Sequence, residues 1–196
     1  MDLLQRMIRE QGVVVDGEVL KVDSFLNHRI EPVLMRAIAK EFAERFGNAR
    51  ITKILTVESS GIAPAVLTGL ELDVPVVFAK KSRSSNMSYS VYDACVHSFT
   101  KNQDYMICVS KEYLSSSDNV LIIDDFLANG QAAIGLIELV SQSGGNVAGV
   151  GVVIEKGFQE GGSLLRSMGI RVESLAIIES MSEDKISFRK IGRAHV

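Results

Sequence analysis

The chain has 196 residues, of which 46% are hydrophobic and 23% are charged, and its formal net charge at pH 7 is -3. This composition is typical of one globular domain, and its slightly acidic balance excludes a protein whose whole surface attracts nucleic acid. The two cysteines, Cys95 and Cys108, form neither a disulfide framework nor a CxxC metal pair, which fits a reducing cytoplasm. No apolar run approaches the ~20 residues that cross a membrane, so we expect a soluble, cytoplasmic single domain over residues 1–196.

Apolar residues recur in two patterns that distinguish helices from strands. In helices they return every three or four residues, as at Leu34, Ile38 and Phe42. In strands that are covered on both faces they run continuously. The predicted elements are, in chain order, an amphipathic helix over 1–12, a helix over 32–46, a strand over 51–57, a helix over 63–71, strands over 74–79, 105–109 and 120–124, a helix over 130–143, and strands over 147–154 and 172–178. Their alternation predicts an α/β fold with a mostly parallel central sheet flanked by helices.

Residues 80–104 interrupt this alternation. They lack a sustained period and are rich in Ser, Lys and Tyr. A connection of this length in a compact domain is typical of a hairpin, a lid or a disordered segment. Two interpretations remain: a flexible surface insertion, or a hairpin lid over a site, with the basic residues Lys80 and Lys81 at its base.

Two predicted strands are followed by turns rich in small residues that lead into a helix. These turns lie in ESSG at 58–61 and in FLANGQA at 126–132. Parallel α/β sheets bind ligands at the carboxyl ends of their strands. A small-residue turn that opens a helix presents free backbone N–H groups to a phosphate. Asn129 and Gly130 both tolerate a positive φ, so this turn can wrap an oxyanion closely. An ordinary capped turn is the alternative interpretation of ESSG.

The stretch VLIIDDFLANGQA places two adjacent carboxylates, Asp124 and Asp125, between a predicted strand and such a turn. Beside a phosphate these charges are repulsive unless they are compensated. They become favourable if they accept hydrogen bonds from sugar hydroxyls, or if they hold water around Mg²⁺, which prefers carboxylates together with substrate phosphates. The alternative is a structural ion pair with Lys53 or Arg50.

These motifs resemble those of the type I phosphoribosyltransferases. VLIIDDFLANGQA resembles their phosphoribosyl pyrophosphate (PRPP) signature, ESSGIAPA their pyrophosphate loop, and FAKKSRS the start of their flexible catalytic loop. The N-terminal LKVDSFLNHRI, the late VIEKGF, and Asn129 where many members have Thr resemble the bacterial branch that acts on xanthine. The resemblance covers about residues 3–188. It implies a small hood, built from the N-terminal segment 1–47 and the C-terminal part, and a flexible catalytic loop over 80–104.

The resemblance implies transfer of phosphoribose from PRPP to N9 of xanthine, with release of pyrophosphate. The expected catalytic residues are Asp124 and Asp125, which would hold the ribose, and Lys80 and Lys81, which would neutralise charge on the leaving pyrophosphate. The expected PRPP-binding residues are Ser59, Ser60 and Gly61 at the pyrophosphate, and Ala128, Asn129, Gly130, Gln131 and Ala132 at the 5′-phosphate. Mg²⁺ is expected to bind mainly through PRPP rather than through direct protein ligands.

The implied base pocket combines the N-terminal segment with the loop that follows the strand over 147–154. Xanthine would contact Leu20, Asn27, Lys156 and Phe158, with Phe158 stacked on the purine. From the residues alone, Leu20 is equally a core residue, Asn27 a turn residue and Lys156 a solvated loop lysine.

The implied partners are xanthine, PRPP and a second copy of the chain in a homodimer, with no nucleic acid or membrane. The lone histidines, His28 and His97, are given no catalytic role. Two alternatives remain, namely a phosphoribosyltransferase for another purine such as guanine or hypoxanthine, and a non-catalytic regulator that senses PRPP. A dinucleotide-binding oxidoreductase is disfavoured because no GxGxxG follows the first strand.

Overall fold

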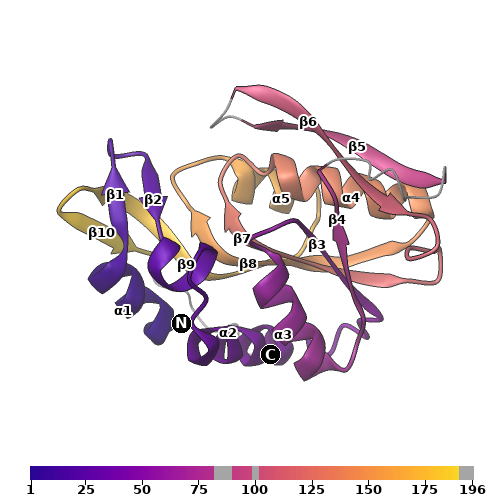
Figure 1. Cartoon of the computed structure of the whole chain (residues 1–196), viewed down its shortest axis with the longest axis horizontal. Helices are drawn as coiled ribbons and strands as arrows, with labels where there is room; N and C mark the ends of the chain where they lie inside the picture. Colours follow the sequence, from indigo (N-terminus) through magenta and orange to yellow (C-terminus); the bar gives the residue numbers. More distant parts are fainter. Residues whose placement is uncertain (82–89, 99–101, 190–196) are drawn as a thin grey trace.

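The computed structural model describes residues 1–81, 90–98 and 102–189. Its centre is a six-stranded sheet in the order β10-β9-β8-β7-β3-β4, in which all neighbours are parallel except β10 and β9 (Figure 1). The strands are β3 Lys53–Val57, β4 Val76–Ala79, β7 Asn119–Leu127, β8 Asn146–Lys156, β9 Val172–Ser182 and β10 Lys185–Phe188. The predicted α/β fold with a mostly parallel sheet is confirmed.

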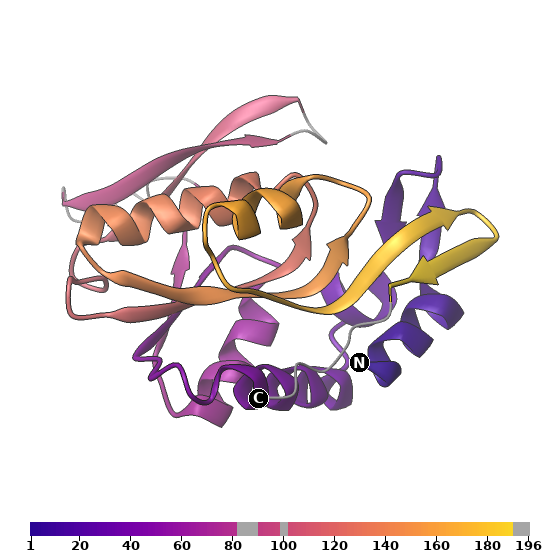
Figure 2. The same cartoon turned by 180° about the vertical axis from the view of Figure 1, so that it is seen from behind.

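Helices cover both faces of this sheet (Figures 1 and 2). One face carries α2 Pro32–Phe46 and α3 Ile62–Leu72, and the other carries α4 Gln131–Ser143 and α5 Gly161–Ser167. Successive residues of a strand point to opposite faces, so each strand serves two cores. Ile54 and Leu121 belong to the core under α2, whereas Leu55 and Ile122 belong to the core under α4. Within the described residues, no helix has the length and apolar character needed to cross a membrane.

The N-terminal segment and the last strands lie together at one end of the sheet (Figure 1). The segment consists of helix α1 Asp2–Gln11, strands β1 Val13–Val15 and β2 Val19–Lys21, and a short π-helix η1 Asp23–Asn27. The predicted helix over 1–12 is confirmed. The three-residue strands and η1 were not predicted because they are too short to show a period.

Strands β5 Val91–Ser98 and β6 Gln103–Ser110 form an antiparallel hairpin outside the central sheet. The strand predicted over 105–109 therefore exists, but its expected place in the parallel sheet is wrong. The apolar residues of both hairpin strands pack on the outer side of α4. A Cβ atom added to Gly135 of α4 would lie 2.6 Å from Val96 Cγ2 of β5 and 3.1 Å from Ile107 Cδ1 of β6. Burial against a helix gives β6 the same apolar signal as a central strand. Of the segment 80–104, residues 82–89 and 99–101 lie outside the described part.

The boundaries of β7 also differ from the prediction. The predicted strand ended at Asp124, whereas β7 continues to Leu127, so Asp125 as well as Asp124 lies within it, and Asp124 pairs with Val152 of β8. Charged residues are disfavoured in buried strands, and for this reason the end predicted from the sequence lies too early in the chain. The consequence is a pair of acids held by the sheet itself.

Candidate active site

The turn between β3 and α3, residues 58–61, lies against the acid pair of β7. A Cβ atom added to the buried Gly61 would overlap Thr56 Oγ1 and would lie 3.1 Å from Asp124 Oδ1. Thr56 is fully buried, and its hydroxyl has no hydrogen-bond partner among the described residues. Ser59 is exposed, and the peptide that joins it to Glu58 is cis. The backbone of this turn therefore runs directly over Asp124, and position 61 has no room for a side chain.

Asp124 and Asp125 are almost completely buried, with exposed fractions of 6% and 7%. The N–H of Asp125 donates to Asp124 Oδ1 at 3.0 Å. Burial, and then the neighbouring Asp125, raise the pKa of Asp124 well above its ordinary value, and Lys81 opposes the rise. Burial thus disfavours the ionised form of Asp124 relative to an exposed carboxyl group, and a ligand that brings positive charge or hydrogen-bond donors would favour that form.

The ion-pair alternative for the acid pair is not supported. Lys53 Nζ lies 2.8 Å from Asp118 Oδ2 and donates to the carbonyl of Tyr113 at 2.7 Å. Lys53 is the first residue of β3, and Asp124 lies near the end of the parallel strand β7, so the two residues occupy opposite ends of the sheet. Burial would raise the pKa of Asp118, but its bonds with Lys53 and Ser115 lower it. Lys53 thus stabilises the far end of the sheet.

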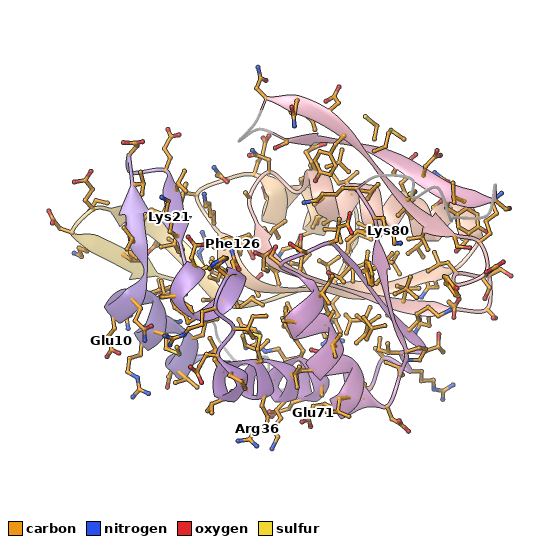
Figure 3. All side chains as sticks on the ribbon, viewed as in Figure 1. Glu10, Lys21, Arg36, Glu71, Lys80 and Phe126 are labelled. Atoms are coloured by element: carbon orange, nitrogen blue, oxygen red, sulfur yellow. The ribbon has the colours of Figure 1, made fainter. Side chains whose placement is uncertain are left out.

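Lys80 and Lys81 follow β4 at the base of the hairpin. The backbone N–H and C=O of Lys80 each bond Cys108 of β6 at 2.9 Å, which joins the edge of the central sheet to the hairpin. The N–H of Lys81 donates to Glu58 Oε1 at 2.6 Å. Lys81 is close enough to affect the pKa of Asp124. In Figure 3, Phe126 of β7 lies between Lys21 at the end of β2 and Lys80 at the end of β4.

The turn between β7 and α4 adopts the conformation that its glycine permits. Gly130 has φ +82°, and its carbonyl accepts the N–H of Ile134 at 2.9 Å as α4 begins. Asn129 has no positive φ, so of the two predicted residues only Gly130 uses the left-handed region. The first N–H groups of α4 have no partner within the helix and are available to an anion. A cavity of about 190 Å³ lies beside this turn and is lined by residues 126–133 and by the hairpin.

The predicted base-pocket residues differ in burial and in the contacts that they make. Leu20 is 6% exposed and belongs to the core, whereas Phe158 is 45% exposed. Lys156 Nζ donates to the carbonyl of Glu18 at 2.7 Å, which connects the end of β8 with the β1–β2 hairpin. Burial lowers the pKa of Lys156, and Glu18 opposes this change. Asn27 is exposed at the end of η1 and makes no side-chain hydrogen bond within the described part of the chain.

The sequence suggested a hairpin lid over residues 80–104, but it did not identify the residues with which the hairpin lines the 190 Å³ cavity. His97, Ser98 and Tyr105 line it opposite the turn of α4. Burial, and then Asp124, raise the pKa of Tyr105, and Lys81 Nζ lies 5.5 Å from the centre of its ring. His97 Nδ1 lies 2.7 Å from Asp104 Oδ1. The missing signal was the pairing of the two strands, which places His97 opposite Asp104 and cannot be read from either strand alone.

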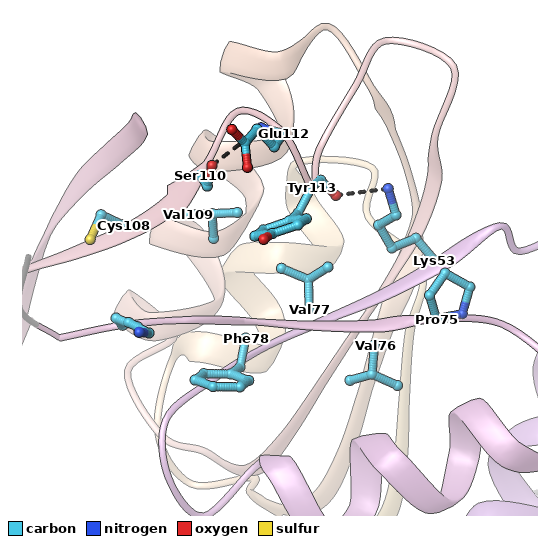
Figure 4. Close-up of a pocket in the computed structure, with 11 residues that line it drawn as sticks. Lys53, Pro75, Val76, Val77, Phe78, Cys108, Val109, Ser110, Glu112 and Tyr113 are labelled. Atoms are coloured by element: carbon cyan, nitrogen blue, oxygen red, sulfur yellow. Dashed lines mark hydrogen bonds between the residues drawn. The ribbon is translucent and has the colours of Figure 1, made fainter. Parts of the chain in front are cut away.

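A larger cavity of about 750 Å³ lies between β4 and β6 (Figure 4). Its lining includes Phe78, Val109 and Tyr113, together with Lys80, and neither acid of β7 lines it. The larger cavity is therefore separate from the acid pair and its two turns. Lys80 lines it, whereas Lys81 is the lysine that lies near the acids.

The acid pair fits Mg²⁺ bound chiefly through a ligand. No three His, Cys, Asp or Glu side chains of the described ranges gather to ligate a metal. Asp124 and Asp125 offer hard carboxylate oxygens, and Mg²⁺ typically binds one or two carboxylates together with substrate phosphates and water. This set of donors suits such a mode and does not form an all-protein cage.

Comparisons with known proteins agree with this geometry. Residues 21–163 match the family model described as a phosphoribosyl transferase domain, and the chain belongs to this family. The curated xanthine phosphoribosyltransferase of Oceanobacillus iheyensis is 56% identical over 193 residues, which is 98% of this chain and 100% of that protein. The xanthine phosphoribosyltransferase of Bacillus cereus is also 56% identical, over 100% of both chains. The resemblance predicted from the motifs is confirmed.

Solved structures support the fold. The adenine phosphoribosyltransferase of Rhodothermus marinus has a TM-score of 0.74 at 22% identity and covers 91% of this chain and 100% of its own. The enzyme of Giardia lamblia, solved with 9-deazaadenine, has a TM-score of 0.73 at 21% identity and covers 89% of this chain and 96% of its own. The central sheet with helices on both faces is therefore the type I phosphoribosyltransferase fold.

Proposed function

We propose that this protein transfers the phosphoribosyl group of PRPP to N9 of xanthine, and thereby forms xanthosine 5′-monophosphate (XMP) and pyrophosphate in purine salvage. One observation carries the proposal: a buried acid pair on β7 lies between two glycine turns, one in contact with Asp124 and one at the start of α4. The 56% identity to xanthine phosphoribosyltransferases over the full chain supports xanthine as the acceptor.

In this proposal PRPP binds along the carboxyl ends of β3 and β7. The 5′-phosphate accepts hydrogen bonds from the amides of residues 128–132, and the pyrophosphate accepts them from the turn of Ser59, Ser60 and Gly61. Asp124 and Asp125 hold the ribose hydroxyls between these ends. The close approach of Gly61 to Asp124 supports this order, because the two proposed subsites, for the pyrophosphate and for the ribose, must be adjacent.

The reaction breaks the bond between C1 of the ribose and the pyrophosphate oxygen and forms a bond between C1 and N9, which loses its proton. Positive charge develops at C1, as in other substitutions at sugar carbons. The acid pair stabilises that charge, and Lys81, supported by Lys80, stabilises the negative charge that grows on pyrophosphate. Asp124 and Asp125 would contact Mg²⁺ directly or through water, and the bound ion would supply further charge neutralisation at the pyrophosphate.

Recognition of xanthine requires hydrogen-bond donors because its C2 and C6 substituents are both oxygens. The amide of Asn27 and the backbone N–H groups near Lys156 are such donors, and Phe158 and Leu20 supply apolar surface. The exposed position of Phe158 supports a stacking role, since it leaves a ring face accessible. Guanine carries an amino group at C2, which would leave a hydrogen-bond donor of the protein unpaired. The protein would therefore stabilise the transition state with guanine less than the transition state with xanthine.

We further propose that the protein acts in the cytoplasm as a homodimer. The family resemblance supports the dimer, and the lack of a disulfide between Cys95 and Cys108 within the described residues is consistent with a reducing compartment.

A panel of acceptors tests the proposal. Pyrophosphate release is measured with PRPP, Mg²⁺ and, in separate reactions, xanthine, guanine, hypoxanthine, adenine and orotate. We expect the highest kcat/KM with xanthine. A higher value for another base would overturn the choice of acceptor, and no release with any base would favour a regulator that only senses PRPP.

A further inference from the structure

The first residue of α5 lies directly against the predicted 5′-phosphate turn. The N–H of Gly161 donates to the carbonyl of Ala128 at 2.9 Å. A Cβ atom added to Gly161 would overlap that carbonyl and would lie 2.6 Å from Gly130 N and 2.8 Å from the carbonyl carbon of Asn129. A Cβ atom added to Gly130 would lie 3.1 Å from Gly161 Cα. Two glycines far apart in sequence thus bring two backbones into contact.

An ion pair between the buried Glu155 and Arg166, whose side chain is 41% exposed, connects α5 to the end of β8. Glu155 is 2% exposed, and its two carboxylate oxygens accept bonds from Nη1 and Nη2 of Arg166 at 2.9 and 2.8 Å. The hydroxyl of Ser174 donates to the same carboxylate. A Cβ atom added to Gly162 would overlap Glu155 Oε1 and would lie 2.6 Å from Arg166 Nη1. The start of α5 is therefore enclosed by the phosphate turn on one side and by the Glu155–Arg166 pair on the other.

The contacts of Glu155 favour the ionised form of its carboxyl group. Burial would raise the pKa of Glu155, but the bonds from Arg166 and Ser174 outweigh burial and lower it. A bidentate pair of this kind also fixes the direction of both groups, which a single point contact does not. Glu155 is the residue before Lys156, so the pair fixes the end of β8 as well as the helix.

One short segment consequently joins the two predicted halves of the site. Residues 156–160, which include Lys156 and Phe158, run from the fixed Glu155 to the fixed Gly161. Lys156 also bonds the β1–β2 hairpin through the carbonyl of Glu18. The purine side and the phosphate side are therefore connected over five residues of backbone, residues 156–160.

We propose that Glu155, Gly161, Gly162 and Arg166, here named the α5 support cluster, position the 128–132 turn for binding of the 5′-phosphate. This inference rests on the proposed function because it takes that turn as the phosphate site. Gly161 is a positioning residue: it acts on the ligand through the backbone of Ala128–Gly130. Amide donors that hold a phosphate tolerate little displacement, and a misplacement of about 1 Å can cost about 10²-fold.

Gly161→Ala tests the proposal because the added methyl meets backbone atoms that no side-chain rotation can clear. Binding of ribose 5-phosphate and of PRPP with Mg²⁺ is measured by titration calorimetry, and kcat and KM are measured for PRPP and xanthine. We expect the Kd for ribose 5-phosphate and the KM for PRPP to rise about tenfold or more, with a smaller change in the KM for xanthine. Unchanged values, within twofold of wild type, would overturn the proposal.

Two further variants separate positioning from stability. Ser167 lies on the same helix but is exposed and outside the cluster, so Ser167→Ala should leave the binding of ribose 5-phosphate and PRPP unchanged. Arg166→Lys keeps the charge but loses the bidentate geometry, so it should weaken ribose 5-phosphate binding less than Gly161→Ala does. It also preserves the test if Gly161→Ala does not fold. Variants that unfold at lower temperature but bind like wild type, when measured well below their Tm, would show a structural role only and overturn the proposal.

Failure of this inference is distinguishable from failure of the proposed function. Wild-type protein that binds PRPP and forms XMP, with a Gly161→Ala variant that binds equally well, would overturn the α5 support cluster alone. Weakened ribose 5-phosphate binding in the variant, with another purine as the acceptor, would retain the cluster and reject xanthine. Wild-type protein that binds neither ribose 5-phosphate nor PRPP would overturn both.

Discussion

The two proposed halves of the site, one for phosphoribose and one for the purine, are built in different ways. The phosphoribosyl half consists of backbone turns and buried acids in mutual contact: Gly61 lies against Asp124, and Gly130 lies against Gly161. The purine half is assembled from separate segments, and two of its predicted residues, Asn27 and Phe158, are exposed. This difference agrees with the proposed roles, because fixed amides suit a phosphate whereas side chains that adjust can hold a flat base.

This comparison predicts that changes in the phosphoribosyl half reduce turnover most. Asp125→Asn removes a positioned charge beside C1 but preserves the size of the side chain, so kcat should fall by about 10²-fold. Steady-state kinetics with saturating PRPP and xanthine measures the effect. A rate close to wild type would contradict the assigned role.

The packing of the pyrophosphate turn should be intolerant of even one methyl group. In Gly61→Ala the new Cβ atom overlaps the hydroxyl of the fully buried Thr56. Overpacking of this kind costs about 1–3 kcal/mol, so the free energy of unfolding should fall and the KM for PRPP should rise. Denaturant unfolding and kinetics report the two effects. Thr56→Ala combined with Gly61→Ala should recover part of the loss, and no recovery would argue against this contact as the cause.

Substitutions in the purine half should change selectivity and leave PRPP binding nearly intact. Asn27→Ala removes a donor, and its cost in kcat/KM for xanthine should be about tenfold, with little change in the Kd for PRPP. Because Asn27 is exposed, the free energy of unfolding of the variant should match that of wild type. Equal losses for xanthine and for PRPP would contradict the separation of the two halves.

The smallest expected effect is a gain in stability at the acid pair. Because burial and Asp125 raise the pKa of Asp124, the folded chain keeps a proton that the unfolded chain releases above about pH 4. The free energy of unfolding therefore falls as the pH rises from there through the raised pKa. Asn does not titrate, so Asp124→Asn should avoid this loss.

At pH 7 we expect Asp124→Asn to have a higher Tm than wild type, although it is less active. Thermal unfolding measured from pH 4 to pH 8 gives the difference in Tm between the variant and wild type. This difference should grow as the pH rises from 4. A lower Tm than wild type across this range would contradict the raised pKa of Asp124.

The sequence predicted the strand, turn and helix around the acid pair well because these parts are contiguous. A continuous apolar strand, two acids and a small-residue turn occur within thirteen residues, VLIIDDFLANGQA, and both the sheet and the turn followed from local rules. The exception is the extent of β7: the acids lie inside the strand, where local rules disfavour charge. Departures from local rules of this kind are expected at functional sites, which agrees with the proposed role of the acid pair.

The remaining parts could not be predicted because they depend on contacts between distant residues. Nothing near Gly161 indicates that it touches Ala128, and nothing near Tyr105 indicates that the hairpin lines the same cavity. The apolar residues of β6 predicted a central strand because burial against α4 leaves the same pattern as burial in a sheet. The roles of Leu20, Asn27, Lys156 and Phe158 came from family resemblance and stay predictions.

A competition reaction tests the central claim most directly. Wild-type protein is given PRPP and Mg²⁺ with xanthine and guanine at equal concentrations, and the nucleotide products are separated and quantified. The ratio of XMP to guanosine 5′-monophosphate equals the ratio of the two kcat/KM values. We predict that XMP predominates at least tenfold, since a donor left unpaired by guanine costs about 1–3 kcal/mol. Predominance of the guanine nucleotide, or the absence of both nucleotides, would contradict the proposed function.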